Sequence, residues 1–215
     1  MEKWRTLLHS ALECLESVEK IGIDTSWWAL GGGASLILRY DHRLTNDVDV
    51  FLKDPQALPA LSPRLNDRTM HLASDYEEGS SSLKLVLPDG EIDFVASPLL
   101  TDPAMEWRVI EGRRIQVETP LEVAAKKVFY RGVDFKPRDL IDLAFLLEAE
   151  PGFGEQLGPV VVGQLDLLDL RLRVLEATWP PPLGVVELKP PAEAVVTRAP
   201  AIVRTWIERQ RALRR

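Results

Sequence analysis

The segment that most constrains the fold runs from Gly31 to Leu52 and reads GGGASLILRYDHRLTNDVDVFL. Three glycines follow the short apolar run 27–30, and residues 34–40 have the composition of a helix. Residues 47–52 alternate polar and apolar side chains, which is typical of a half-buried strand. A tight turn, a helix and a strand in this order predict a mixed α/β structure for the first part of the chain.

Two aspartates on the predicted strand provide the first chemical signal. Asp47 and Asp49 are two residues apart, so their carboxylates lie on one face, roughly 6–7 Å apart at Cα. Val48 and Val50 point to the opposite face, into a core. Neighbouring carboxylates repel each other and need a cation or a raised pKa, and Mg²⁺ suits such oxygen ligands. The alternative for an isolated Asp-x-Asp is a solvated strand edge.

The glycines and Ser35 make a phosphate site plausible beside these carboxylates. Glycines allow a ligand to approach the backbone, and the start of the following helix offers unpaired N–H groups and a positive dipole end. Ser35 adds a hydroxyl group in the first turn. Three glycines alone would indicate only a tight turn, but their combination with the two aspartates favours binding of a metal-bound phosphate.

A third carboxylate comes from a predicted hairpin. Residues 83–87 and 91–96 flank Pro88-Asp89-Gly90, a sequence typical of a hairpin turn. Asp93 is placed on the opposite face of its strand from Ile92 and Phe94. Three carboxylates on neighbouring strands can hold two Mg²⁺ ions for in-line nucleotidyl displacement. The alternative is that Asp93 lies on a solvated hairpin face.

A second charged segment spans residues 119–147. Lys127 and Arg131 are four residues apart on one predicted helix, and Asp139 and Asp142 are three apart on the next. For the two aspartates we favour a salt-bridge cluster between antiparallel helices. Lys127 could instead contribute its charge to a triphosphate.

The remaining pattern predicts an α+β fold of two domains, with residues 1–118 as an α/β core and residues 119–215 as a helical domain. Helices are expected at 3–20, within 55–67, and at 121–131, 138–149, 160–177 and 192–214, with a second hairpin at 107–110 and 114–117. Gly152, Gly154 and Gly158 are expected to interrupt the helical pattern.

Composition and charge exclude several classes of protein. The single cysteine, Cys14, excludes an intramolecular disulfide and a Cys-rich zinc site. No apolar run approaches the ~18–20 residues of a membrane span, so we expect a cytoplasmic protein without membrane contact. The net charge of −7 argues against non-specific coating of nucleic acid. The arginine-rich segment 203–215 could nevertheless be a phosphate-contacting face for RNA or a solvated tail.

The two charged segments together resemble the AbiEii/AbiGii-type nucleotidyltransferases, a branch of the polymerase-β-like superfamily known mostly as toxins of toxin–antitoxin pairs. The first family motif is matched without a gap by Gly32, Gly33, Ala34, Ser35, Leu36, Arg39, His42, Arg43, Thr45, Asp47, Asp49 and Phe51. The later motif is matched by Glu122, Ala125, Lys127, Arg131, Arg138, Asp139, Asp142 and Leu143. The resemblance covers residues 25–150, whereas residues 151–215 match no pattern of the family.

The resemblance implies a nucleotidyltransferase-like mixed sheet with flanking helices, followed by a helical part. It implies that Asp47 and Asp49 bind Mg²⁺, with Asp93 as a more variable third carboxylate. Gly32, Gly33 and Ser35 would hold the nucleotide phosphates, and Lys127 would be an active-site lysine, with Lys126 as the alternative. The supporting residues would be Arg39, His42, Arg43, Thr45, Arg131, Arg138, Asp139 and Asp142, among which His42 and Arg43 brace the loop before the strand.

We therefore expect an enzyme of the EC 2.7.7 type that moves a nucleotidyl group from an NTP to an acceptor and releases pyrophosphate. By resemblance, the acceptor is tRNA or a protein hydroxyl, and a cognate antitoxin binds and blocks the site. The alternatives are a small-molecule, antibiotic-type nucleotidyltransferase and a non-catalytic module of the same fold that binds a nucleotide or a partner.

Overall fold

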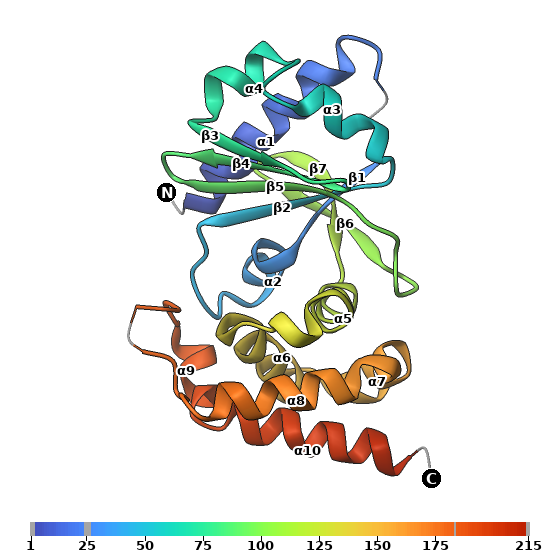
Figure 1. The fold of residues 1–215 in the computed structure, drawn as a ribbon, viewed down its shortest axis with the longest axis vertical. Helices are drawn as coiled ribbons and strands as arrows, with labels where there is room; N and C mark the ends of the chain where they lie inside the picture. Colours follow the sequence, from blue (N-terminus) through green and yellow to red (C-terminus); the bar gives the residue numbers. More distant parts are fainter. Residues whose placement is uncertain (1–2, 24–26, 183, 214–215) are drawn as a thin grey trace. The chain divides into compact units, whose positions relative to one another are not determined.

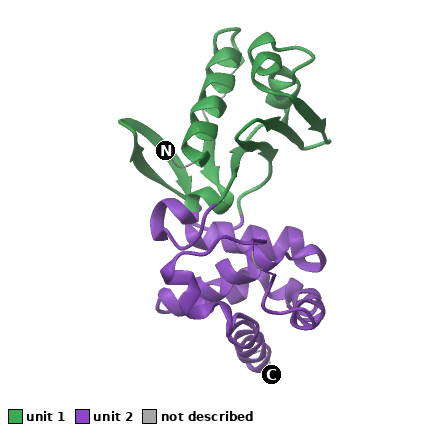
Figure 2. Ribbon diagram, turned by 90° about the vertical axis from the view of Figure 1, so that its left-hand side faces the viewer, with its two compact units in different colours: residues 1–35, 45–99, 105–118 green, residues 36–44, 100–104, 119–215 purple. Residues whose placement is uncertain are grey.

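The computed structural model describes residues 3–23, 27–182 and 184–213, and the chain divides into two compact units (Figure 2). The first, here called the sheet unit, comprises Met1–Ser35, Thr45–Leu99 and Met105–Glu118. The second, the helical unit, comprises Leu36–Leu44, Leu100–Ala104 and Thr119–Arg215. Within the described residues, no helix is long and apolar enough to cross a membrane.

The sheet unit is built on a mixed seven-stranded sheet with the strand order β3-β4-β5-β2-β1-β7-β6 (Figure 1). The strands are β1 (Trp28–Gly31), β2 (Asp47–Leu52), β3 (Asp75–Glu78), β4 (Ser82–Leu87), β5 (Gly90–Ala96), β6 (Met105–Ile110) and β7 (Arg113–Glu118). Pairs β1–β7 and β2–β5 are parallel, and the others are antiparallel. The α+β class, the strand at 47–52 and both hairpins are thus confirmed. Strand β3 was not predicted, because its sequence DYEE is exposed throughout and has no apolar alternation.

Three helices, α1 (Lys3–Glu19), α3 (Leu58–Leu61) and α4 (Asp67–Leu72), cover one face of the sheet (Figure 1). The apolar stripe of α1 is buried because residues three and four apart share one side of a helix. The inward-facing side chains of β2, β4 and β5 are also fully buried: Val48, Val50, Leu52, Leu83, Leu85, Ile92 and Phe94. This core fixes which residues of the same strands face the other way.

The expected single helix within 55–67 is wrong in detail. Residues Pro55–Ala57 form a 3-10 turn, α3 is one turn long, and α4 begins only at Asp67. Pro63 disfavours a helical conformation of the preceding Ser62, which is extended and ends α3. The Asn66 side chain accepts a hydrogen bond from the Thr69 N–H at 3.1 Å and caps α4.

Helices α5 to α10 form the helical unit around a core of their own. Their bounds are α5 (Pro120–Arg131), α6 (Pro137–Ala149), α7 (Phe153–Val161), α8 (Leu165–Glu176), α9 (Pro190–Val196) and α10 (Ala199–Ala212). Helix α2 (Gly32–Tyr40) begins in the sheet unit and continues into the helical unit. The helices predicted at 121–131 and 138–149 are confirmed as α5 and α6.

Two predicted features of the C-terminal part are wrong in part: Gly152, with φ +76°, does interrupt the helical pattern before α7, but the other two glycines do not. Gly154 and Gly158 lie inside α7, where they make room for α10: a Cβ on Gly154 would stand 2.7 Å from the Trp206 ring. The helices expected at 160–177 and 192–214 are each interrupted. A 3-10 turn at Val162–Gln164 separates α7 from α8, and Pro200, near the start of α10, begins a new helix after α9.

Part of the arginine-rich segment is engaged in ion pairs of the helical unit, whereas Arg209 is exposed. Arg204 of α10 pairs with Glu176 of α8, and Arg211 donates a hydrogen bond of 3.1 Å to Asp169 and also pairs with Asp166. Ion pairs therefore hold α10 along α8. Arg214 and Arg215, which belong to the same predicted basic segment, lie outside the described residues.

We predict that Gly154→Ala lowers the free energy of unfolding by about 1–3 kcal/mol, because the added methyl group overlaps the rigid, buried Trp206 indole. Gly163→Ala is the matched control, since a Cβ there meets nothing within 4 Å. Urea titrations of both variants measure the difference. A Gly154→Ala protein as stable as Gly163→Ala would contradict the close packing of α10 on α7.

Candidate functional site

The carboxylates of the sheet unit lie on the face opposite α1, here called the site face. Asp49 of β2 is the register partner of Asp93 on the parallel strand β5 and of Gly31 on the antiparallel strand β1. Residues paired in this way share a face, and neighbouring strands are about 4.8 Å apart. Asp47, two residues earlier on β2, is paired with Glu91, two residues earlier on β5. The sheet thus brings the three sequence-predicted aspartates together, each partly exposed.

The crowding of acids affects Asp93 most. Burial, reinforced by the negative charge of Asp49, raises the pKa of the Asp93 carboxyl to about 6. Lys84 of β4 brings a cation to these acids: its Nζ lies 2.8 Å from Glu91 Oε2 and 4.0 Å from Asp93 Oδ2. Sequence reasoning missed Lys84, although its place between Leu83 and Leu85 of an alternating strand puts it on the polar face.

The glycine turn is shaped by two acidic side chains. Gly32 has φ +57°, and a Cβ there would lie 1.8 Å from Asp49 Oδ2. A Cβ on Gly31 would lie 2.3 Å from Glu118 Oε2, because the parallel pairing of β1 with β7 sets Glu118 beside Gly31. Both glycines therefore leave space for carboxylates as well as for a turn. Glu118, only 2% exposed, was not predicted; the available signal is an acid ending an alternating strand.

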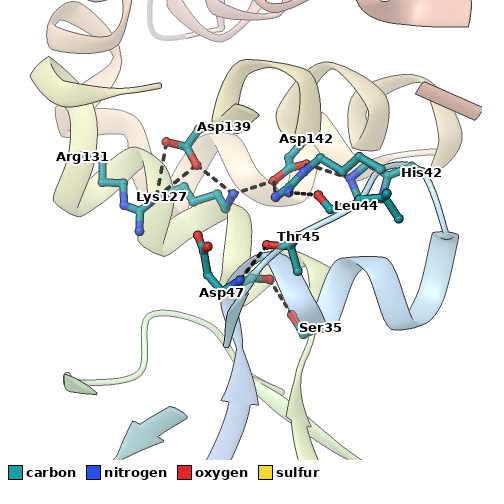
Figure 3. Close-up of polar contacts among 11 residues, drawn as sticks. Ser35, His42, Leu44, Thr45, Asp47, Lys127, Arg131, Asp139 and Asp142 are labelled. Atoms are coloured by element: carbon teal, nitrogen blue, oxygen red, sulfur yellow. Dashed lines mark hydrogen bonds and ion pairs between the residues drawn. The ribbon is translucent and has the colours of Figure 1, made fainter. Parts of the chain in front are cut away.

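The start of α2 supplies the backbone N–H groups expected near a phosphate. Gly32 and Gly33 are its first two residues, and N–H groups at this position have no partner within the helix. The Ser35 hydroxyl is buried and donates to the Gly32 carbonyl at 2.9 Å, so it closes the turn (Figure 3). Thr45 Oγ1 accepts from the Asp47 N–H at 3.3 Å and fixes the start of β2.

These residues suit a metal that completes its shell with other ligands. Among the described residues, no group of three His, Cys, Asp or Glu side chains is arranged to hold a metal ion. Mg²⁺ usually takes one or two carboxylates and finds its remaining ligands in water and substrate phosphates. Asp49 and Asp93, in register and with the raised pKa of Asp93, provide hard oxygen donors that a divalent cation would stabilise.

In the helical unit, Asp142 is the centre of an ion-pair cluster whose buried members are His42, Arg43, Lys127 and Asp139, and the partly exposed Arg131 joins it at Asp139 (Figure 3). Arg43 donates to both Asp142 oxygens, from Nε at 2.7 Å and from Nη2 at 2.9 Å. Lys127 Nζ donates to Asp142 Oδ2 at 2.6 Å and to Asp139 Oδ1 at 2.8 Å. Arg131 Nη1 adds a bond of 3.2 Å to Asp139. The expected ion-pair contact between α5 and α6 is therefore present.

Burial and charge act in opposite directions on the two acids of the cluster. Burial alone would raise the pKa of Asp142, but Arg43 and Lys127 together with the hydrogen bonds from Arg43 and His42 hold it well below the usual value. The charges of Lys127 and Arg131 likewise lower the pKa of the buried Asp139. Both acids are therefore ionised: Asp142 ties the loop residues 42–43 to α6, and Lys127 connects both acids to α5.

The two neighbouring lysines of α5 have different surroundings. Lys127 is held between Asp139 and Asp142, whereas Lys126 Nζ lies 3.4 Å from Glu122, one turn earlier. Glu122 is itself buried and accepts from the backbone N–H groups of Leu100 and Thr101. The remaining predicted supporting residues, Arg39 in the last turn of α2 and Arg138 in the first turn of α6, are half-buried.

We predict that Asp93→Asn stabilises the metal-free protein at pH 7.5 by on the order of 1–3 kcal/mol. The folded-state pKa of about 6 exceeds the ordinary 3.8, so ionisation of Asp93 removes stability as the pH rises through this window. The difference from wild type should shrink as the pH falls to 4. Urea unfolding in EDTA measures it, with the exposed Asp75→Asn as control; equal stability at pH 7.5 would contradict the crowding of acids.

We predict that Asp142→Asn destabilises the protein by about 3–5 kcal/mol, because Arg43 and Lys127 would lose a buried counter-charge. The matched control is Asp166→Asn, which removes an exposed partner of Arg211 and should cost less than about 1 kcal/mol. Thermal and urea unfolding measure both. Similar losses in the two variants would show that the cluster contributes no more than a surface pair.

Comparison with known proteins identifies the family of the chain. The family model "Nucleotidyl transferase AbiEii toxin, Type IV TA system" matches residues 20–168. Solved structures that resemble the chain include a suspected nucleotidyltransferase of H. pylori (16% identity, 96% of both chains, TM-score 0.45) and JHP933 of Helicobacter pylori (17%, 94% of both chains, 0.42). A third is the Bradyrhizobium diazoefficiens CD-NTase CdnG in complex with GTP (11%, 100% of this chain and 88% of that chain, 0.31). No curated protein matches. The family match covers more than half of the sequence, and the chain belongs to the AbiEii nucleotidyltransferase toxin family.

Proposed function

We propose that this protein is a Mg²⁺-dependent nucleotidyltransferase that transfers a nucleotidyl group from an NTP to an acceptor hydroxyl. The observation that carries the proposal is the pairing of Asp49 with Asp93 across β2 and β5, beside the Gly31-Gly32 turn. This places adjacent carboxylates next to the first N–H groups of α2. Carboxylates that recruit a divalent cation and N–H groups that bind phosphate oxygens are what transfer from a triphosphate requires.

Asp47 and Asp49 would hold the metal, with Asp93 as the third oxygen donor. When bound, Mg²⁺ would supply positive charge to the phosphate oxygens of the nucleotide. The chain itself supplies the alignment: the N–H groups of Gly32 and Gly33 would bind phosphate oxygens, and the Ser35 bond to Gly32 fixes the turn. Such positioning accounts for much of the catalysis of phosphoryl and nucleotidyl transfer.

In the reaction that we propose, the acceptor oxygen attacks the α-phosphorus as the bond from that phosphorus to the β-phosphate oxygen breaks. The products are the nucleotidylated acceptor and pyrophosphate. We assign Asp93 to accept the acceptor's proton, because it neighbours Asp49 and is partly exposed on the same face. Lys127 is the active-site lysine of the proposal, and Asp139 and Asp142 set the position of its ammonium group.

The acceptor that we propose is tRNA or a protein hydroxyl, and a cognate antitoxin is the proposed partner. Membership of a toxin family of type IV toxin–antitoxin systems supports an antitoxin encoded with this protein. A small-molecule, antibiotic-type acceptor is the alternative that we keep for the same transfer reaction. Incubation with α-labelled NTPs and separate tRNA, protein and aminoglycoside pools distinguishes these acceptors.

We predict that Asp49→Asn lowers nucleotidyl transfer at least about 100-fold, because it removes a carboxylate charge that would hold the divalent cation at the triphosphate. Asp89→Asn, in the exposed turn between β4 and β5, is the matched control and should keep wild-type activity. Pyrophosphate release with Mg²⁺ and NTP measures both variants. Undiminished release by Asp49→Asn would refute the proposed site, and nucleotide binding without release by the wild type would favour a non-catalytic module.

A further inference from the structure

A cavity of about 640 Å³ lies in the sheet unit at the far end of β2 from Asp47. It is lined by Trp27, Lys53, Pro55, Ser80, Ser81, Ala96, Ser97, Pro98 and Leu99. These residues come from the segment before β1, the segment after β2, the β3–β4 turn and the end of β5. Its size is that of a site for a small organic ligand, and none of the residues assigned to transfer lines it.

The cavity and the carboxylates lie along the same strand, β2. Asp49 and Phe51 alternate onto the site face of β2, and Lys53 comes two residues after Phe51, directly beyond the end of the strand. The Lys53 N–H donates to the Trp27 carbonyl at 3.5 Å, which extends the pairing of β2 with β1. Four residues of extended chain span about 13 Å, the distance from Asp49 to Lys53 along the strand.

The lining combines the groups that recognise a phosphate and a planar ring. Lys53 is exposed and offers an ammonium group, and Ser80, Ser81 and Ser97 offer three hydroxyls. The Ser97 Oγ is buried and has no hydrogen-bond partner among the described residues, so turning it toward a ligand breaks no bond. The neighbouring Asp54 carboxylate is already engaged, since it accepts from the Gln56 N–H at 2.9 Å.

Trp27 provides the apolar surface of this lining. Its indole is partly exposed, and Leu99, Pro55 and Pro98 add apolar atoms around the same cavity. A base stacked on an aromatic side chain contributes about as much affinity as a well-placed polar contact and does so for any base. A ligand with a planar base and a phosphate therefore matches this lining better than a purely apolar one.

We propose that this cavity binds a nucleoside phosphate unit, with its base against Trp27 and its phosphate at Lys53. The assignment of this cavity to the acceptor strand rests on the proposed transfer function. At ~3.4 Å per stacked nucleotide, 13 Å corresponds to about four nucleotides, and to fewer if the strand is extended. The half-buried Phe51 and Val95 lie between the cavity and the carboxylates on the site face. A single-stranded nucleic acid whose end reaches Asp49 would thus place an upstream residue in the cavity.

The test measures binding in EDTA, which separates the cavity from transfer. A fluorescein-labelled single-stranded hexaribonucleotide is titrated with wild type, Trp27→Ala, Trp27→Phe and Lys53→Gln. We expect Trp27→Ala and Lys53→Gln to raise the Kd at least fivefold and Trp27→Phe to retain most of the affinity. Lys53→Gln should also reduce the slope of log K against log salt by about 0.7. Matched controls are Lys20→Gln and Tyr76→Ala, exposed residues of the same unit outside the cavity.

Competition with AMP identifies the source of the nucleotide unit. A hexamer that binds more than tenfold tighter than AMP assigns the cavity to an acceptor strand, and AMP that competes equally assigns it to a free nucleotide. Absence of binding of both probes to the wild type, or values for Trp27→Ala and Lys53→Gln within twofold of wild type, would overturn the proposal.

Asp49→Asn serves as the internal reference in this experiment, because transfer should be lost while hexamer binding still depends on Trp27 and Lys53. If wild type transfers no nucleotide but the hexamer still depends on Trp27 and Lys53, only the proposed transfer fails. If transfer is present and the cavity variants bind normally, only this proposal fails. Circular dichroism and urea midpoints of Lys53→Gln, a change at an exposed side chain, confirm that folding is retained.

Discussion

The contact on which the site depends is that of Asp49 against Gly32. A carboxylate oxygen occupies the space where any other residue would have a Cβ, and Gly31 stands in the same relation to Glu118. The glycine turn and the carboxylates are therefore one steric unit. The positive φ of Gly32 starts α2 directly after β1, so the first N–H groups of the helix lie beside the acids. Backbone conformation, phosphate-binding groups and metal-binding groups are fixed together by this packing.

The aspartates of the two units lie in opposite electrostatic surroundings. In the sheet unit, acids crowd on one face, and burial together with the charge of Asp49 raises the pKa of Asp93, so stability is lost when Asp93 ionises. In the helical unit, Asp142 is surrounded by cations, and its pKa is lowered. Crowded acids suit a site that binds a cation. The cation-surrounded Asp142 suits a framework that holds Lys127 and the loop before β2 in place. Aspartate residues thus serve the proposed function in one unit and stability in the other, because their electrostatic surroundings differ.

The sequence allowed the sheet unit to be predicted better than the helical unit. Alternation in DVDVFL and the Pro-Asp-Gly turn identify β2, β4 and β5, because period-two burial leaves a direct trace in the residue order. The ends of the C-terminal helices could not be predicted, since Gly154 and Gly158 break helices by propensity but here serve tertiary packing against Trp206 and Gln210. Glu118 and Lys84 were missed because their roles come from strand order, which a single sequence does not reveal.

The account is tested most directly by calorimetric titration of Mg²⁺ and a non-hydrolysable NTP into Gly32→Ala. The added methyl group would displace the Asp49 carboxylate, so we expect metal-dependent nucleotide binding at least tenfold weaker than in wild type. Gly22→Ala has the same kind of positive φ with open space around it, and it should bind like wild type. Wild-type affinity in Gly32→Ala would contradict the claim that the glycine turn and Asp49 form one metal- and phosphate-binding unit.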